Sequence, residues 1–569
     1  MRNQELAKLL YEIADMYEIQ GVQWKPNAYR KAAQAIETMS QDIAEYAREH
    51  KLTEIPGVGE SIAEKIAEWL AKGEITLHEE LKRQLPIELV ELTSVPGLGP
   101  KKAKRLYDEL KIKNLEDLKR AASAHRIRDL KGFGEKSEAE ILHGIELLEK
   151  SKGRAMLGYV LEDVKAIVSV LKKHRAVGQI EPAGSVRRWK ETIGDIDILV
   201  TSTDPKAVMD HFTSLPYVEE VVAKGDTKSS VRLKNGLNCD LRVVEPEAFG
   251  AALQYFTGSK EHNIATRRIA IEKGWKLSEY GLFEEKSGKR IAGKTEEEIY
   301  KRLGLAYIEP ELRENTGEIE AAKQGKLPKL IEQKDIRGEF HVHTKTTDGV
   351  NTIEEMAEAA KKLGYEYVAI SDHTGTLYVA HGLDDKRMRE HMQRIEKAER
   401  KAGIRLLKGA EVNITKEGEL DLGNAVLAEL DVVIAAVHSH FNQPQEEMTR
   451  RILRALDSEH VDIFAHPTGR LIGQREAYNV DLEKVIEFCV KNDKILEINS
   501  FPDRTDLNDE SIRLAKKKGA LFAVNTDSHS TEHLRFIELG IHTARRGWLE
   551  KKDVINCLSL KELEKKLRL

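Results

Sequence analysis

The chain has 569 residues, which is too long for one hydrophobic core, so we expect roughly three to five domains. Its hydrophobic content of 40% and charged content of 33% are ordinary for a soluble globular protein, and its longest apolar runs, such as residues 432–437, exclude a membrane span. Three cysteines without a CxxC motif favour a reducing cytoplasm, and a net charge of −5 does not by itself indicate a nucleic-acid partner.

Residues 1–150 show the apolar periodicity of helices, and a Gly-x-Gly turn precedes an amphipathic helix three times. The glycines of these turns are Gly57 and Gly59, Gly97 and Gly99, and Gly132 and Gly134. Such a turn exposes backbone N–H groups at a helix N-terminus and lets a phosphate approach closely. A single copy could be a helix-capping glycine, but three copies favour helix-hairpin-helix motifs that bind the DNA backbone without reading bases. Residues 101–136 carry 12 Lys/Arg against 6 Asp/Glu, which suits this partner, although a solvated helix face is the alternative.

Three aspartates then fall on two segments that alternate polar and apolar residues. Asp195 and Asp197 lie on one face of a predicted strand at 195–200, and Asp240 lies on one face of a second strand at 237–243. If the strands pair side by side, the three carboxylates meet and repel one another unless cations neutralise them. Oxygen ligands favour Mg²⁺ or Mn²⁺, and two such ions support attack on phosphorus. The alternative is a solvated acidic strand face, but residues 184–188 supply phosphate donors nearby and favour the metal site.

A charged stretch at 314–333 is the best linker candidate, and seven short apolar strands alternate with helices after it. They are predicted at 339–343, 367–373, 406–413, 432–438, 461–466, 495–499 and 521–526. This alternation predicts a closed parallel barrel, whose chemistry lies at the C-terminal ends of its strands. The potential metal ligands at those ends are His341, His343, Asp348, His373, Glu411, His438, His466, Asp527 and His529. Imidazole and carboxylate ligands together favour Zn²⁺, Mn²⁺ or Fe²⁺, whereas His440 and Glu497 fit the pattern less well.

Residues 1 to about 315 resemble the family X DNA polymerases. The matching motifs are Gly184-Ser185, Arg188, Asp195-x-Asp197, Asp240 with Arg242, residues 255–259, Asn263 and Arg267. The resemblance implies that Asp195 and Asp197 bind two ions and that Asp240 helps to activate the primer 3′-hydroxyl. The residues it implies for nucleotide binding are Gly184, Ser185, Arg188, Tyr255, Phe256, Gly258 and Asn263, with Arg154 as a helper. It implies that Asn263 and Arg267 contact the nascent base pair or the template.

The amino-terminal region resembles the 5′-deoxyribose-phosphate lyase domain of this family, through residues 27–33 and 62–66. Lys65 stands where the family has its Schiff-base lysine, and Tyr29 is implied to bind DNA. Trp24 and Ser61 stand where the beta enzyme of the family has basic phosphate-binding side chains. The expected 5′-phosphate pocket is therefore weakened, and a solvated helix lysine is the alternative for Lys65.

The C-terminal half resembles the polymerase-and-histidinol-phosphatase (PHP) family through residues 341–344, 371–373, 409–411 and 526–529. That family binds up to three metals, which implies three ligand groups here. The groups are His341, His343, Glu411 and Asp527; then Glu411, His438 and His466; and then Asp348, His373 and His529. Metal-bound hydroxide and clamped phosphate oxygens would make this barrel a phosphoesterase.

The chain is thus expected to be multidomain, with an α+β nucleotidyltransferase core between helical domains and a (β/α)7-type PHP barrel. The expected segments are a lyase-like DNA-binding domain at 1–85, fingers at 86–150, a palm at 151–245, a thumb at 246–315, a linker at 316–335 and the barrel at 336–569. The predicted function is gap-filling DNA synthesis in base excision repair, with 3′–5′ exonuclease, 3′-end-processing or abasic-site endonuclease activity in the barrel. Gapped or primer-template DNA and deoxynucleoside triphosphates are the expected partners of a cytoplasmic, nucleoid-associated monomer without membrane contact.

Two alternatives stay open at this point. The chain could be a non-catalytic repair scaffold, or its barrel could be a small-molecule phosphatase. Because the two metal sites lie in domains joined by the 314–333 stretch, we also expect each site to work independently of the other.

Overall fold

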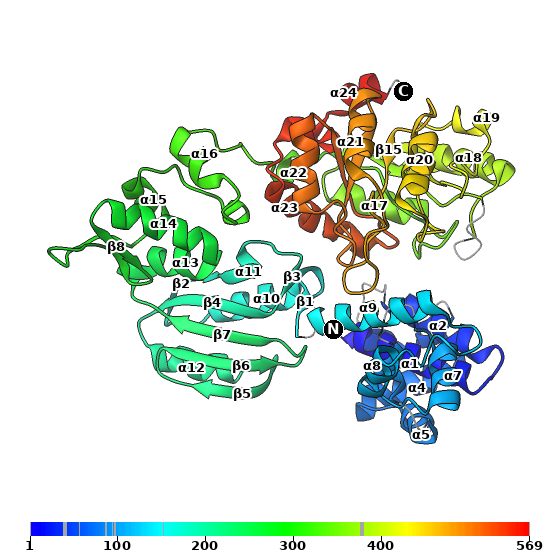
Figure 1. Cartoon of the computed structure of the whole chain (residues 1–569), viewed down its shortest axis with the longest axis horizontal. Coiled ribbons are helices and arrows are strands. Elements are labelled where there is room, and N and C mark those ends of the chain that lie inside the picture. The colour runs from blue at the N-terminus through cyan, green and yellow to red at the C-terminus, as the bar shows by residue number, and fades with distance from the viewer. Residues whose placement is uncertain are drawn as a thin grey trace.

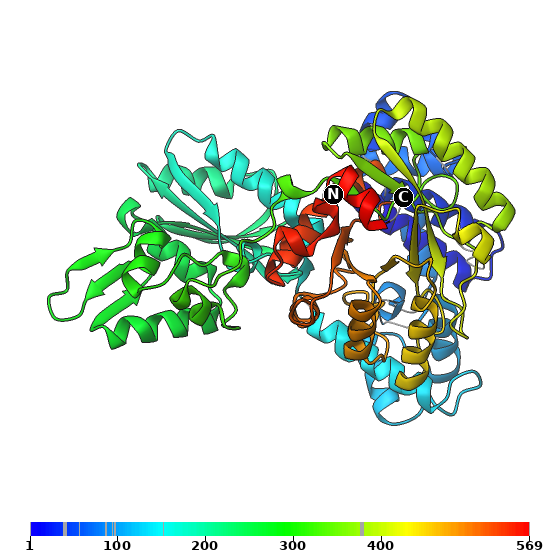
Figure 2. The same cartoon turned by 90° about the horizontal axis from the view of Figure 1, so that it is seen from above.

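The computed structural model describes residues 2–37, 43–55, 57–85, 88–93, 95, 98–151, 153–375 and 381–567. A helical body, a palm with its thumb, and a barrel follow one another along the chain (Figures 1 and 2). In Figure 1 the blue helical body lies below the barrel, and the green palm and thumb lie to one side of both. Among the described residues, no helix is both long and apolar enough to cross a membrane.

The helical body has one shared core that includes Leu10, Ile66 and Leu106. Its helices are α1 (Arg2–Ile19), α2 (Lys25–Glu37), α3 (Ile43–Arg48), α4 (Glu60–Lys72), α5 (Thr76–Gln84), α6 (Leu89–Thr93), α7 (Pro100–Leu110), α8 (Leu115–Ser123) and α9 (Glu135–Ser151). Gly59 and Gly99 cap the N-termini of α4 and α7, as the repeated turn predicts. Gly134 directly precedes α9, whereas Gly97 lies outside the described residues.

The palm is a five-stranded sheet in the order β2-β4-β7-β6-β5. These strands are β2 (Val177–Pro182), β4 (Asp195–Ser202), β7 (Asn238–Val243), β6 (Lys228–Leu233) and β5 (Val218–Lys224). Helices α10 (Leu157–Lys172) and α12 (Pro205–Thr213) pack together on the face that carries Ile196 and Ile198. The opposite face is therefore left for the polar residues of β4, next to the short helix α11 (Gly184–Arg187). A short antiparallel pair, β1 (Ala155–Met156) and β3 (Thr192–Ile193), completes the palm.

The thumb continues from the palm through α13 (Phe249–Thr257) and ends beyond the position that the sequence predicts. Its other elements are α14 (Lys260–Glu272), β8 (Trp275–Ser278), β9 (Gly281–Glu284), β10 (Arg290–Ala292) and α15 (Glu296–Leu303). The segment predicted as a linker contains a further helix, α16 (Glu318–Gln324), whose Ile319 and Ala322 join the thumb core. Glu318 is buried and lies 2.7 Å from His262 Nδ1, so this part of the segment is thumb rather than linker. Two small apolar residues and one buried hydrogen bond are too weak a sequence signal to predict that this segment packs on the thumb.

The C-terminal half forms a seven-stranded parallel sheet in chain order, as predicted. Its strands are β11 (Gly338–Glu339), β12 (Tyr367–Ile370), β13 (Arg405–Asn413), β14 (Val432–Ala436), β15 (Ile463–Phe464), β16 (Ile495–Asn499) and β17 (Phe522–Asn525). A parallel bridge between Val342 and Ser528 brings the first and last strands together, which nearly closes the barrel. The helices of this half are α17 (Ile353–Lys362), α18 (Asp385–Ala402), α19 (Asn424–Leu427), α20 (Gln445–Leu456), α21 (Leu482–Lys491), α22 (Asp509–Lys518), α23 (Ile537–Arg546) and α24 (Leu560–Leu567).

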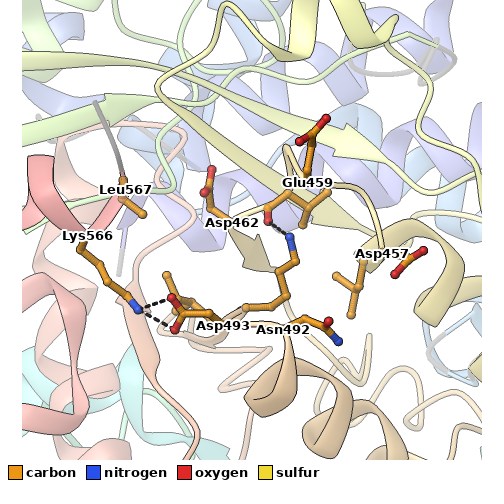
Figure 3. A pocket seen from close by; sticks show the side chains of 11 residues that line it. Asp457, Glu459, Asp462, Asn492, Asp493, Lys566 and Leu567 are labelled. Carbon is orange, nitrogen blue, oxygen red and sulfur yellow. Dashed lines mark hydrogen bonds and ion pairs between the residues drawn. The ribbon is translucent and has the colours of Figure 1, made fainter.

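A cavity of about 320 Å³ opens at the N-terminal end of strands β15 and β16 (Figure 3). Asp462 and Asp493 line it, and Lys566 of α24 pairs with Asp493 at 2.6 Å. The predicted metal ligands lie at the opposite, C-terminal ends of the strands, so this cavity is separate from the candidate site.

Candidate metal centres of the palm and the barrel

The three palm aspartates meet on one sheet face. Strand β4 runs parallel to β7, and Asp197 of β4 lies directly opposite Asp240 of β7. Asp195 is the first residue of β4. Burial raises the pKa of Asp197 to about 6, and repulsion from Asp195 and Asp240 adds to the rise. Burial alone would also raise the pKa of Asp240, but Ser230 and Lys228, whose Nζ lies 2.9 Å away, lower it by hydrogen bonding. This repulsion among oxygen ligands is what a hard divalent cation would relieve, so the residues fit Mg²⁺ or Mn²⁺.

The loop that leads into α11 approaches these carboxylates closely. Gly184 has φ +62°, and a Cβ atom there would lie 3.0 Å from Asp197 Oδ2. Ser185 follows it and is half-buried. Arg154 donates to the Thr192 carbonyl at 2.6 Å and lies beside Gly194, next to Asp195. Glycine at position 184 therefore lets the loop that leads into α11 lie directly against the Asp197 carboxylate.

Arg188 is fixed between the palm and the thumb. Its Nε donates to Glu314 Oε1 at 3.1 Å, and its NH1 donates to the carbonyl of Thr257. Gly258 has φ +71°, and a Cβ there would come within 3.1 Å of Arg188 NH1. No local sequence pattern predicts this role of Glu314, because it lies 126 positions away from Arg188.

The thumb residues assigned to the sugar and base divide into two groups. Tyr255 and Phe256 are half-buried and pack edge to face at 5.1 Å, with the Arg242 guanidinium 4.7 Å from the Phe256 ring centre. Asn263 is only 7% exposed, and its amide donates to the Tyr255 carbonyl at 2.7 Å and accepts from Gln254 at 2.8 Å. These hydrogen bonds tie Asn263 to the end of α13, and its contact with the nucleotide stays a prediction.

Arg267, assigned to the template, is half-buried beside this group, and its Nε donates to the Asn263 carbonyl at 3.1 Å. In the helical body, Tyr29 is 5% exposed, and its ring centre lies 5.7 Å from that of Tyr17, so most of its side chain lies in the core. Lys65 lies on α4 and is half-buried, whereas Trp24 is 85% exposed. A helical sequence pattern does not distinguish a buried tyrosine from an exposed one, and the DNA contact of Tyr29 stays a prediction.

All nine predicted ligands of the barrel converge at the C-terminal ends of its strands. Glu411 of β13 is central: its carboxylate lies 2.8 Å from His373 Nδ1, 3.0 Å from His466 Nε2 and 3.1 Å from His438 Nε2. A second group joins His341 and His343 to Asp527, and a third joins His343, His373 and His529 to Asp348. Although burial alone would raise the pKa of Glu411, the surrounding imidazoles hold it well below its usual value.

The donor set fits bound metal ions. Nε2 of His341 and Nδ1 of His343 are buried without a hydrogen-bond partner among the described residues. Buried polar atoms without partners are costly, and divalent ions coordinated by imidazole and carboxylate would satisfy them. Glu497, which the sequence pattern fitted less well, is fully buried with Oε1 2.7 Å from His341 Nδ1. It therefore orients the imidazole of His341. His440 is exposed and belongs to none of these groups.

Comparisons with known proteins cover both halves of the chain. Family models match a helix-hairpin-helix domain at 1–75, a SAM-like helix-hairpin-helix tandem at 89–146, the DNA polymerase beta thumb at 252–314 and a PHP domain at 339–501. The chain is 26% identical to DNA polymerase lambda of Rattus norvegicus over 341 residues, 55% of this chain and 56% of that one. It is 30% identical to a probable phosphatase of Thermoanaerobacter sp. (strain X514) over 228 residues, 38% of this chain and 88% of that one.

One relative matches from end to end. The chain is 39% identical over 568 residues to the DNA polymerase/3′-5′ exonuclease PolX of Bacillus subtilis (strain 168), which covers 99% of both proteins. The thumb model covers Thr257 and Glu314 of the palm–thumb junction, and the PHP model covers seven of the nine barrel ligands, all except Asp527 and His529. The chain therefore belongs to the PolX family, the family X DNA polymerases that carry a C-terminal PHP domain.

Proposed function

We propose that this protein fills short gaps in DNA by template-directed synthesis and trims 3′ ends with the exonuclease of its barrel. The observation that carries the proposal is the parallel pairing of β4 with β7, which sets Asp195, Asp197 and Asp240 beside the Gly184 loop. End-to-end similarity to a polymerase with 3′-5′ exonuclease activity supports both halves of the assignment.

In the palm, Asp195 and Asp197 would hold the two ions, Mg²⁺ or Mn²⁺, which supply charge stabilisation at the reacting phosphate. Asp240 would accept the proton of the primer 3′-hydroxyl, and Lys228 keeps it ionised for that purpose. Ser185 and Arg188 would hold the triphosphate, since both follow the glycine that approaches the carboxylates.

In the barrel, the three ligand groups would hold up to three ions of Mn²⁺, Zn²⁺ or Fe²⁺, which supply a hydroxide nucleophile at neutral pH. His529 and Asp348 are the most open ligands, with 25% and 22% of their side chains exposed, so the DNA end would enter on their side. A small-molecule phosphatase is the competing assignment, and similarity to a probable phosphatase supports it over the barrel alone. The DNA-binding motifs on the same chain favour DNA as the substrate.

Two double variants test this proposal. Asp195→Ala with Asp197→Ala should abolish primer extension on one-nucleotide gaps and leave digestion of 3′-labelled DNA intact. His341→Ala with His343→Ala should do the reverse. Exonuclease activity that survives loss of both histidines but vanishes with loss of both aspartates would show that the nuclease site lies in the palm and not in the barrel. Competition between labelled DNA and a small phosphomonoester separates the exonuclease from the phosphatase.

We further propose that Lys65 of α4 forms a Schiff base with a 5′-deoxyribose phosphate, because it stands where the lyase domain of family X polymerases has its Schiff-base lysine. Borohydride trapping of wild type but not of Lys65→Ala on incised abasic DNA would support the lyase step, and equal trapping would contradict it.

We also propose that the protein is a cytoplasmic monomer that acts on gapped DNA and deoxynucleoside triphosphates. Sedimentation with and without DNA tests the oligomeric state.

A further inference from the structure

The palm and the barrel are in direct contact, and the contact falls on the nucleotide-binding segment of the palm. The Trp189 ring stacks on His542 of α23 at 3.6 Å with an interplanar angle of 3°. Figures 1 and 2 both show α23 on the side of the barrel that faces the palm. Glu191 pairs with Arg470 of the barrel at 2.6 Å, so residues just beyond Arg188 are held by the barrel. The domains are therefore joined by this contact as well as by the 314–333 stretch, and the independence of the two sites stays a prediction.

Arg546, the last residue of α23, reaches into the palm–thumb junction. Only 4% of its side chain is exposed, and its NH2 pairs with Asp509 of the barrel. Its NH1 donates to the backbone carbonyl of Arg188 at 2.9 Å and to Glu314 Oε1 at 3.1 Å. The same oxygen of Glu314 accepts a hydrogen bond from Arg188 Nε at 3.1 Å. One carboxylate oxygen is thus shared between a guanidinium of the barrel and a guanidinium of the polymerase site.

This arrangement determines which part of Arg188 can meet a ligand. Within the described residues, the hydrogen bonds of its side chain use Nε, toward Glu314, and NH1, toward the Thr257 carbonyl. Its NH2 is the group that remains for a phosphate oxygen. Without Arg546, the half-buried Glu314 carboxylate would keep Lys190 at 3.9 Å but lose one of its two guanidinium partners, and would pair more strongly with Arg188. The Arg188 carbonyl would also lose its donor. Both changes move the guanidinium away from the position that the palm–thumb junction sets.

We propose that Arg546 of the barrel is a positioning residue of the polymerase site: acting through Glu314, it fixes Arg188 to receive the triphosphate. The inference rests on the proposed polymerase function and extends it, because the barrel then completes the nucleotide pocket in addition to its own chemistry.

The test uses the full-length protein and single-nucleotide insertion into a one-nucleotide gap with Mg²⁺. Arg546→Ala and Glu314→Gln should each raise the KM for the incoming nucleotide about three- to tenfold and leave kcat within about twofold. Arg546→Lys keeps the charge, but an ammonium group cannot reproduce the planar donor geometry with which the guanidinium binds Asp509, Glu314 and the Arg188 carbonyl together. Its KM should therefore lie between those of wild type and Arg546→Ala. The nucleotide KM of the double variant, Arg546→Ala with Glu314→Gln, should not exceed that of the more affected single variant, because both substitutions remove the same contact. Glu538→Gln is the matched control: it breaks the 2.6 Å Lys165–Glu538 pair across the same interface without touching Arg188.

Digestion of 3′-labelled single-stranded DNA is measured for every variant and should match wild type. The melting temperature is measured alongside, and it should fall in Arg546→Ala, because Asp509 and Glu314 lose an ion-pair partner, without a fall in kcat or in the exonuclease rate. A wild-type nucleotide KM in Arg546→Ala and Glu314→Gln, or a shift equal to that of Glu538→Gln, overturns the inference. A parallel fall in kcat, exonuclease rate and melting temperature also overturns it, because Arg546 would then only hold the fold together. If Arg546→Ala does not fold, Glu314→Gln and Arg546→Lys decide the question. Wild-type protein that inserts no nucleotide would instead refute the proposed function itself.

Discussion

Asp197 lies among carboxylates that the fold brings together at a cost in stability. Because its pKa of about 6 in the folded protein exceeds the ordinary value of 3.8, its ionised form destabilises the fold above about pH 6 and has no such effect below about pH 4. Asp197→Asn should therefore raise the free energy of unfolding at pH 7.5 by about 1–2 kcal/mol in the absence of divalent ions, and the gain should shrink as pH falls from 6 to 4. Urea unfolding across this pH range measures it. The exposed Asp226→Asn should change nothing, and a loss of stability at pH 7.5 in Asp197→Asn would contradict the argument.

Glu497 supports the barrel site without belonging to a ligand group. It lies 2.7 Å from His341 Nδ1, accepts the backbone N–H of His466 at 2.7 Å, and receives the Asn525 amide at 3.0 Å. Glu497→Gln should weaken Mn²⁺ activation of the exonuclease about 10- to 100-fold, because outer carboxylates fix the tautomer and orientation of a ligand imidazole. A Mn²⁺ titration of 3′ digestion checks this, with the exposed Glu487→Gln as a control that should resemble wild type. An equal loss of primer extension would show that Glu497 supports the whole fold instead.

Helices α4 and α7 each begin at a glycine that the fold itself does not require. Gly59 and Gly99 have φ −88° and −77°, and a Cβ atom at either position would meet nothing within 4 Å. A phosphate bound at the helix N-terminus, however, would collide with such a Cβ atom. Gly59→Val and Gly99→Val should therefore lower the affinity for gapped DNA, each roughly tenfold, with little change in melting temperature. Fluorescence anisotropy with labelled DNA measures this; Gly57→Val, at φ +82° and 3.0 Å from Ala32 N, should lose stability instead. Unchanged DNA binding in both Gly59→Val and Gly99→Val would remove these turns from the DNA interface.

Elements with a regular period could be predicted from the sequence, and contacts between distant elements could not. Alternation along β4 and β7 placed Asp197 and Asp240 on matching faces, and repeated βα units predicted the parallel barrel and its ligand-bearing end. The side of a helix that a single residue occupies is less certain, so the burial of Asn263 became visible only in the structure. The pairing of Glu314 with Arg546 spans 232 positions between two domains, and no local pattern encodes such a contact.

At the scale of the whole molecule, the two chemistries use separate ligand sets but share one interface. Residues 330 and 331 already pair with the barrel, through a bridge from Leu330 to Glu550 and a hydrogen bond from Ile331 N to the Leu549 carbonyl at 3.1 Å. The thumb therefore runs directly into the barrel. Removing the barrel would take away the stacking partner of Trp189 and the ion-pair partner of Glu191.

A chain that ends at residue 328 should accordingly keep the carboxylate chemistry but lose part of its nucleotide affinity. We expect primer extension to persist, with a nucleotide KM raised roughly tenfold or more and a lower melting temperature for the palm, because buried charges at the interface lose their partners. The matched control is the full-length His341→Ala, His343→Ala variant, which keeps the interface and should show a wild-type nucleotide KM without exonuclease activity. Gap-filling kinetics and thermal unfolding of the three proteins distinguish the cases. If the shortened chain matched the full-length protein in both measurements, the interface would contribute nothing to the polymerase, and the two sites would be independent after all.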